Sequence, residues 1–248
     1  MSRRTPAPTT TLEQQLRAEG YKCIVGLDEV GKGAWAGPLT IGAAVLRSDV
    51  LDMNEPAAYM GGARDSKQIA ENQRDVAFDV VARTAASWAV GHASAHECDA
   101  LGMNAAQQLA ARRALDQLGV TPDAAIVDGK WDFVAPHISR VIAQVKADTT
   151  CLSVAAASVL AKVTRDRIMR QWAENFPQWH FDTNKGYPCP KHRTALQGYG
   201  PSAVHRTSWA FMPNFVPWLN ADTSGQMTRV CRSPDDRSIP LHQSSRDS

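Results

Sequence analysis

One segment near the start of the chain, residues 26–37, restricts most strongly what this sequence can fold into. It reads Gly-Leu-Asp-Glu-Val-Gly-Lys-Gly-Ala-Trp-Ala-Gly and continues an apolar run that has the length of a buried strand. Asp28 and Glu29 stand at the end of that run. Adjacent carboxylates repel each other unless a cation lies between them, and hard divalent cations prefer oxygen ligands. The segment therefore predicts a buried strand that ends at a metal-binding position.

The glycines that follow the two acids add a second indication. Gly31 and Gly33 flank Lys32, so backbone N–H groups and a positive charge can approach a phosphate or a sugar closely. Metal ligands beside an anion-binding loop favour metal-assisted chemistry on a phosphate ester. An Asp-Glu pair followed by Gly-x-Gly also occurs in ordinary turns, so the segment alone leaves that alternative open.

The length and composition of the chain limit its class. The 248 residues suffice for one generous domain with a small appendage, and no apolar stretch is long enough to cross a membrane. We expect a disordered N-terminal arm at 1–20 without a secretory signal, a catalytic domain at 21–215 and a disordered tail at 216–248. The five cysteines are scattered and form no C-x-x-C pair, which is typical of reduced thiols in a cytoplasmic protein.

Strand-like and helix-like segments interleave along the chain. Hydrophobic patterning predicts strands at 21–28, 39–46, 87–95, 124–127 and 138–145, and helices at 68–84, 104–118 and 152–176. The first two strands form a hairpin, and the later ones alternate with helices. This order predicts an α/β fold with a mixed β-sheet flanked by helices on both faces, followed by short helices at the C-terminal end.

Three of the predicted strands end in acids. Asp28 and Glu29, Asp128 and Asp148 follow the first, fourth and fifth strands. Ends of strands are where α/β sheets place ligand chemistry, so these four carboxylates can converge on one site. Each acid also has an ordinary interpretation. All can start turns, Glu29 can form a surface salt bridge, and Asp148 can cap the helix that begins near Leu152.

Basic residues gather in the second half of the chain. Lys162 and Arg165 belong to one predicted helix, and Lys185 follows it; Lys67 lies further upstream, in Asp-Ser-Lys. Such charges usually form a solvated surface, and the alternative is that they contact phosphates.

Several short motifs, taken together and in order, resemble type 2 ribonuclease H, specifically bacterial ribonuclease HII. The match spans about residues 21–215. The motifs are the segment at 26–38, Asp-Ser-Lys at 65–67, Val-Asp-Gly at 127–129, the alanine-rich 153–166, Lys-Gly-Tyr-Pro at 185–188 and 200–206.

The resemblance implies a ribonuclease-H-like fold and a metal-dependent endonuclease. Such an enzyme cleaves the RNA strand of RNA–DNA hybrids and incises 5′ to ribonucleotides embedded in duplex DNA, leaving 3′-hydroxyl and 5′-phosphate ends. It implies two Mg²⁺ or Mn²⁺ ions at Asp28, Glu29, Asp128 and Asp148. It also implies ribonucleotide recognition by Gly31, Lys32 and Gly33, with Tyr187 against the sugar at the RNA–DNA junction. Lys67, Lys162, Arg165 and Lys185 are candidate phosphate contacts.

Expectations for partners follow from the same resemblance. The substrates are RNA–DNA hybrids and duplex DNA with embedded ribonucleotides, and the protein is expected to be a cytoplasmic monomer without a membrane partner. Contact with a replication clamp is conceivable, but the tail contains no motif that supports it.

The sequence departs from the family pattern at the recognition loop. Lys32 stands where bacterial members commonly have arginine, which keeps the charge but loses the bidentate fork. Lys32 and Val30 also resemble ribonuclease HIII, but that type carries a sizeable N-terminal domain and only about twenty residues precede Tyr21 here. We therefore favour ribonuclease HII.

Two other functions remain as alternatives. One is a catalytically inert hybrid-binding protein, which the four intact carboxylates disfavour because clustered negative charge does not help a pure binder of a polyanion. The other is a different nuclease of the same fold, such as a junction resolvase, which the glycine loop and Tyr187 disfavour.

Overall fold

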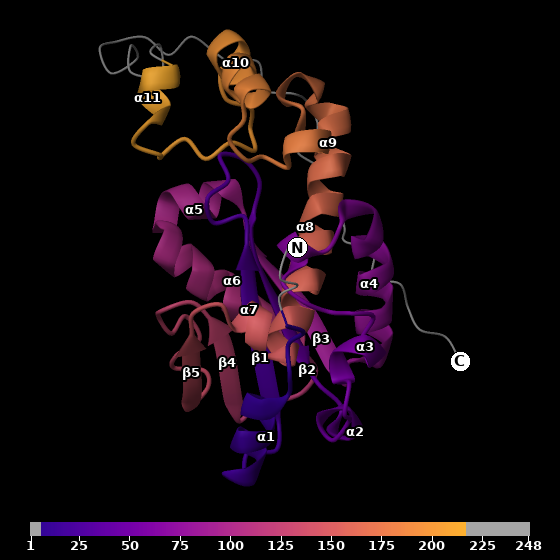
Figure 1. The fold of residues 1–248 in the computed structure, drawn as a ribbon. Coiled ribbons are helices and arrows are strands. Elements are labelled where there is room, and N and C mark those ends of the chain that lie inside the picture. Colours follow the sequence, from indigo (N-terminus) through magenta and orange to yellow (C-terminus); the bar gives the residue numbers. More distant parts are fainter. Residues whose placement is uncertain (1–5, 217–248) are drawn as a thin grey trace.

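A five-stranded mixed sheet with the strand order β3-β2-β1-β4-β5 organises the chain (Figure 1). The computed structural model describes residues 6–216. The strands are β1 (Ile24–Val30), β2 (Leu39–Val45), β3 (Ser87–Ala93), β4 (Ala124–Asp128) and β5 (Arg140–Gln144). β2 pairs antiparallel with β1 and β3, whereas β4 pairs parallel with β1 and β5. The predicted hairpin and mixed sheet are confirmed.

Helices cover both faces of the sheet. One face carries α5 (Ala95–Leu101) and α6 (Met103–Gln117), and the other carries α4 (Glu71–Thr84) and α8 (Leu152–Asn175). The short elements are α2 (Ser48–Leu51), α3 (Pro56–Tyr59), the 3-10 helix η1 (Ser66–Gln68) and α7 (Ala147–Thr150). Among these described elements, no helix is long and apolar enough to span a bilayer.

The helix α8 extends beyond the sheet and carries the C-terminal helices at its far end (Figure 1). These are η2 (Pro177–Trp179), α9 (Phe181–Asn184), α10 (Pro190–Tyr199) and α11 (Met212–Phe215). Their core is aromatic: Trp179 and Phe181 stack with ring centroids 6.4 Å apart. The predicted small C-terminal helical part is therefore present. Of the tail expected at 216–248, only Val216 is described, and it is buried; residues 217–248 lie outside the described part.

Small residues let α8 lie directly on the sheet. A Cβ atom at Gly26 of β1 would lie 2.3 Å from the backbone carbon of Ser153, and one at Gly42 of β2 would lie 2.2 Å from the carbonyl oxygen of Ala157. Neither distance is sterically possible, so both strands need glycine where the helix crosses them. The fully buried Ala155 and Ala156 belong to the same contact, as the alanine-rich sequence predicts.

The N-terminal segment differs from the expectation of a disordered arm at 1–20. Residues Thr11–Ala18 form helix α1, with Leu16 fully buried. Thr9 donates its N–H to the Thr150 carbonyl and accepts from the Leu152 N–H, both at 2.9 Å. The buried Glu13 accepts hydrogen bonds from the backbone N–H and the hydroxyl of Ser153. The segment is ordered because it satisfies free N–H groups at the start of α8.

Glu13 yields a prediction about stability and pH. Burial raises its pKa above the ordinary value of 4.5, and the Ser153 hydrogen bonds only partly offset this. A carboxyl whose pKa is raised by folding stabilises the protein most below pH 4.5 and loses that contribution as the pH rises. We therefore expect Glu13→Gln, which resembles the neutral acid, to gain stability relative to wild type as the pH rises from 4 to 8. Urea denaturation across that range measures it. A stability difference that does not change with pH would contradict the assignment.

Candidate active site

Two of the four predicted acids lie side by side because their strands are parallel neighbours. The pairing places Leu27 of β1 opposite Val127 of β4, so the next residues, Asp28 and Asp128, reach the same level at the end of the sheet. Asp28 is buried, and its Oδ1 accepts the backbone N–H of Glu29 at 2.8 Å. The convergence that strand ends predict therefore occurs for this pair.

Asp148 reaches the site by a different route from the predicted one. β5 ends at Gln144, and Asp148 lies in the short helix α7 rather than at the strand end. Lys146 adopts φ 61° immediately before α7, and Asp128 Oδ1 accepts the Ala147 N–H at 2.8 Å. These features turn the chain so that Asp148 is buried close to Asp128. Asp148 does not cap α8, whose N-cap residue is Cys151.

The acids influence one another strongly. Burial raises the pKa of Asp28 well above its ordinary value; a hydrogen bond from Ser158 opposes this, and the charges of Glu29, Asp128 and Asp148 raise it further. Burial, together with Asp65 and Asp128, raises the pKa of Asp148 to about 6. Positive charge close to such a cluster favours its ionised form.

Lys67 supplies part of that charge. The side chain is 78% exposed, and partial desolvation lowers the pKa of its ammonium, but four carboxylates, led by Asp65, raise it above its ordinary value in total. The donors of the cluster are carboxylate oxygens, the ligands that Mg²⁺ and Mn²⁺ prefer. Among residues 6–216, no three or more His, Cys, Asp or Glu side chains stand in an arrangement that could hold a metal ion, so the acid cluster is not a preformed metal centre. Its chemistry fits a divalent cation, which would relieve the repulsion that raises these pKa values.

A pocket of about 410 Å³ joins the acids to the glycine loop. Its lining contains eight of the twelve residues that the sequence singled out. The full lining is Asp28, Glu29, Val30, Gly31, Lys32, Gly33, Ser66, Lys67, Arg74, Lys162 and Tyr187. Asp128 and Asp148 are not among these lining residues, but their charges raise the pKa of Asp28. The pocket thus combines carboxylates, ammonium groups and exposed backbone in one place.

Tyr187 is tied directly to the glycine loop. Its hydroxyl accepts the backbone N–H of Gly31 at 2.9 Å, although the two residues are 156 positions apart. The half-buried ring lies beside two cationic groups, Lys162 Nζ at 5.8 Å and the Arg165 guanidinium carbon at 5.2 Å from its centroid. Tyr187 is therefore a lining residue of the pocket rather than a core tyrosine.

Two fully buried arginines hold the glycine loop from below. Arg165 donates to the carbonyls of Pro38, Lys185 and Ala36, at 2.9, 2.8 and 3.0 Å. Arg206 donates to the carbonyls of Gly37 and Lys32. Burial lowers the pKa of both guanidinium groups, that of Arg165 to about 10. Because these donors bind carbonyls that no strand partner satisfies, the loop conformation depends on them.

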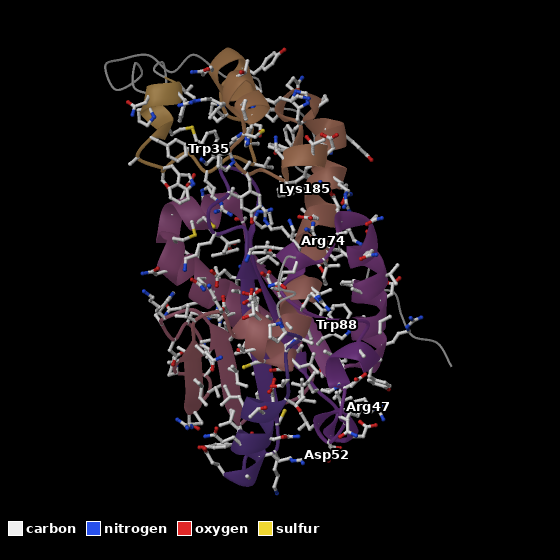
Figure 2. All side chains as sticks on the ribbon, in the orientation of Figure 1. Trp35, Arg47, Asp52, Arg74, Trp88 and Lys185 are labelled. Atoms are coloured by element: carbon white, nitrogen blue, oxygen red, sulfur yellow. The ribbon has the colours of Figure 1, made fainter. Side chains whose placement is uncertain are left out.

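Two of the predicted phosphate contacts are wrong in this structure. Arg165 is fully buried and its guanidinium is used on backbone carbonyls, so it cannot reach a phosphate. Lys185 is also buried, inside the junction between α8 and the C-terminal helices (Figure 2); its ammonium binds the Asp182 carbonyl and pairs with Glu71 at 3.2 Å. Neither burial nor these carbonyl acceptors can be read from a run of basic residues.

Several residues of the site were not singled out by the sequence. The charge of Asp65 raises the pKa values of Asp148 and Lys67, and Arg74 lines the pocket. Gln107 is hydrogen-bonded to both Lys32 and Glu29. Arg206 donates to the Lys32 carbonyl of the glycine loop. Asp65 and Arg206 belong to motifs that carry the family resemblance, which was the available signal. Gln107 lies within an ordinary amphipathic helix and gave none.

Comparisons with known proteins agree with this site. The family model for ribonuclease HII matches residues 25–212. The chain is 45% identical to ribonuclease HII of Streptomyces avermitilis over 235 residues, covering 94% of each chain. It is 46% identical to that of Streptomyces coelicolor over 214 residues, covering 85% of this chain and 87% of the relative. The crystal structure of ribonuclease H2 from Pyrococcus horikoshii superposes with a TM-score of 0.65 at 28% identity, covering 78% of this chain and 97% of the other.

The expectation of ribonuclease HII rather than HIII is thereby confirmed, and so is the ribonuclease-H-like fold. The nuclease activity that the acids and the anion-binding loop indicate is the hydrolysis of phosphodiester bonds in RNA–DNA hybrids, the activity of this family. Both lines of evidence lead to the same assignment: this chain belongs to the ribonuclease HII family.

Proposed function

We propose that this protein cleaves the RNA strand of hybrids and also incises 5′ to single ribonucleotides embedded in duplex DNA, with two divalent metal ions. One observation supports this most: the acids and the glycine loop share a pocket, and Tyr187 is hydrogen-bonded to that loop at Gly31. A site that must detect one 2′-hydroxyl needs the groups that recognise it at a fixed distance from the reacting phosphate. The Tyr187–Gly31 hydrogen bond holds two such groups together beside the acids.

Asp28, Glu29, Asp128 and Asp148 would hold the metal ions. Mg²⁺ or Mn²⁺ bound there would supply an activated water and charge stabilisation for the leaving oxygen. Attack of water on phosphorus breaks the bond to the 3′-oxygen, which leaves 3′-hydroxyl and 5′-phosphate ends. Lys67, whose Nζ lies 3.8 Å from Asp65 Oδ1, lines the same pocket and is placed to contact a phosphate. Lys162 also lines the pocket, but its positive charge is compensated by an ion pair with Asp166 at 2.8 Å.

Recognition of the ribonucleotide is assigned to the loop backbone and Tyr187. Gly33 is exposed, and a Cβ atom built on it meets nothing within 4 Å, so its backbone faces open space in the pocket. A 2′-hydroxyl both donates and accepts hydrogen bonds, which suits contact with a backbone freed of side chains. The Tyr187 ring would then lie against the neighbouring deoxyribose, where a second 2′-hydroxyl would clash.

Removal of a metal ligand tests the catalytic part. We expect Asp28→Asn to reduce cleavage of a hybrid by about a thousandfold, or roughly 4 kcal/mol of transition-state stabilisation, because the cluster loses the charge that holds the cation. Hybrid binding should persist or tighten, since one negative charge facing the phosphates is removed. Gel assays with Mg²⁺, Mn²⁺ or a chelator measure cleavage, and anisotropy of a labelled hybrid measures binding. Substantial residual cleavage would show that Asp28 is not a ligand.

The two glycines of the loop should respond differently to alanine. A Cβ at Gly31, where φ is +88°, would lie 2.3 Å from Arg165 Nε and 2.7 Å from the Pro38 carbonyl oxygen. We expect Gly31→Ala to destabilise the fold by about 2 kcal/mol or more. Gly33→Ala should leave the melting temperature unchanged and weaken only substrate binding, because its methyl group projects into the pocket. Equal losses of stability in both variants would contradict this separation.

Junction recognition can be separated from catalysis at Tyr187. We expect Tyr187→Ala to lose more activity on duplex DNA with one ribonucleotide than on a long hybrid, because the single site offers one junction and the hybrid offers many registers. Tyr187→Phe keeps the ring but leaves the Gly31 N–H without its acceptor, at a cost of about 1–3 kcal/mol in stability. The ratio of kcat/KM values on the two substrates is the measurement. A ratio that stays at the wild-type value in Tyr187→Ala would assign junction sensing elsewhere.

A further inference from the structure

Gln107 of α6 lies between a positive and a negative group of the pocket. Lys32 Nζ donates to Gln107 Oε1 at 2.9 Å, and Gln107 Nε2 donates to Glu29 Oε2 at 3.3 Å. The orientation of the amide follows from its partners, since an ammonium can only donate and a carboxylate can only accept. Gln107 is 1% exposed, so its amide has little access to water.

The same arrangement separates the two charges. Lys32 lies close enough to Glu29 to lower the pKa of its carboxyl, against the larger effect of burial. Yet no ion pair within 4.0 Å joins Lys32 to any carboxylate among residues 6–216. The Gln107 amide therefore bridges the two charged groups, one hydrogen bond to each. The ammonium of Lys32 also lies over the Trp131 ring, whose centroid is 5.9 Å from Nζ.

We propose that Gln107 is a positioning residue that keeps Lys32 and Glu29 apart, so that the lysine stays available to the nucleic acid and the carboxylate to the metal ion. This rests on the proposed roles of Lys32 and Glu29. A direct ion pair would neutralise both groups at once, because a lysine bound to Glu29 competes with the cation for the same oxygens. The spacer solves a problem specific to a lysine at this position, since a compact ammonium on a flexible stem can move onto a nearby acid.

The decisive variant is Gln107→Met, which keeps the length and burial of the side chain and removes the amide. We expect Lys32 to move onto Glu29 and the affinity for Mn²⁺ without nucleic acid to fall about tenfold, in the range typical of lost outer-sphere partners. Hybrid affinity should also fall. Mn²⁺ binding is measured by isothermal titration calorimetry, and hybrid binding by fluorescence anisotropy in a chelator.

Removal of the lysine distinguishes spacing from packing. In Lys32→Met/Gln107→Met no ammonium remains to occupy Glu29, so Mn²⁺ affinity should recover to within about twofold to threefold of the Lys32→Met value. A packing defect at Gln107 would not be rescued in this way. Unchanged Mn²⁺ affinity in Gln107→Met, or a loss that persists in the double variant, would overturn the proposal.

Controls keep the outcomes separate. Gln108→Met changes the exposed neighbour on the same helix and should leave both affinities at wild-type values. If Gln107→Met does not fold, Gln107→Asn shortens the same amide and replaces it in the identical scheme. Asp28→Asn tests the metal site itself: if it binds Mn²⁺ normally, the proposed metal ligands are wrong. If it has lost Mn²⁺ binding while Gln107→Met retains it, only the spacer role is wrong.

Discussion

The close contact between α8 and the sheet is the constraint on which the rest of the molecule depends. It requires glycine at Gly26 and Gly42, because any side chain there would overlap the backbone of the helix. Once the helix is seated, its residues serve successive parts of the protein. Ser153 donates to Glu13 of the N-terminal helix, Ser158 donates to Ser66 of the pocket lining, and Arg165 supports the glycine loop. A single helix thereby sets the distance between the acids and the recognition loop.

Charge is distributed unevenly around the pocket, and this has a physical consequence. Within the acid cluster, burial and mutual repulsion raise the pKa values of Asp28 and Asp148. Behind the loop, Arg165 and Arg206 are buried positive groups whose hydrogen bonds all go to carbonyls. The acids therefore favour bound cations, while the loop presents a positive potential to a polyanion. A substrate carrying phosphates next to metal ions complements both halves of this field.

Hydrophobic patterning was sufficient for the regular elements. It predicted all five strands, and the helices α4, α6 and α8, to within a few residues, because these segments bury one face or both and carry the corresponding periodicity. It failed at residues 11–18, where the stabilising contact joins the buried carboxyl of Glu13 to Ser153 at the start of α8, 140 positions away in sequence. It also failed to place Asp148 correctly, since the turn into α7 depends on the left-handed Lys146 and on a hydrogen bond to Asp128.

The sequence by itself determined the family, the mixed sheet and the position of Asp28, Glu29 and Asp128 at the ends of strands, because motif order and local periodicity are properties of the chain alone. Only the tertiary structure decided which polar side chains reach the pocket. Lys67 and Tyr187 line it. Arg165 and Lys185, which are as basic as Lys67, instead donate hydrogen bonds to backbone carbonyls inside the fold. The sequence also did not predict the role of Gln107. That role depends on its position between Lys32 and Glu29, which the packing of α6 against the sheet determines.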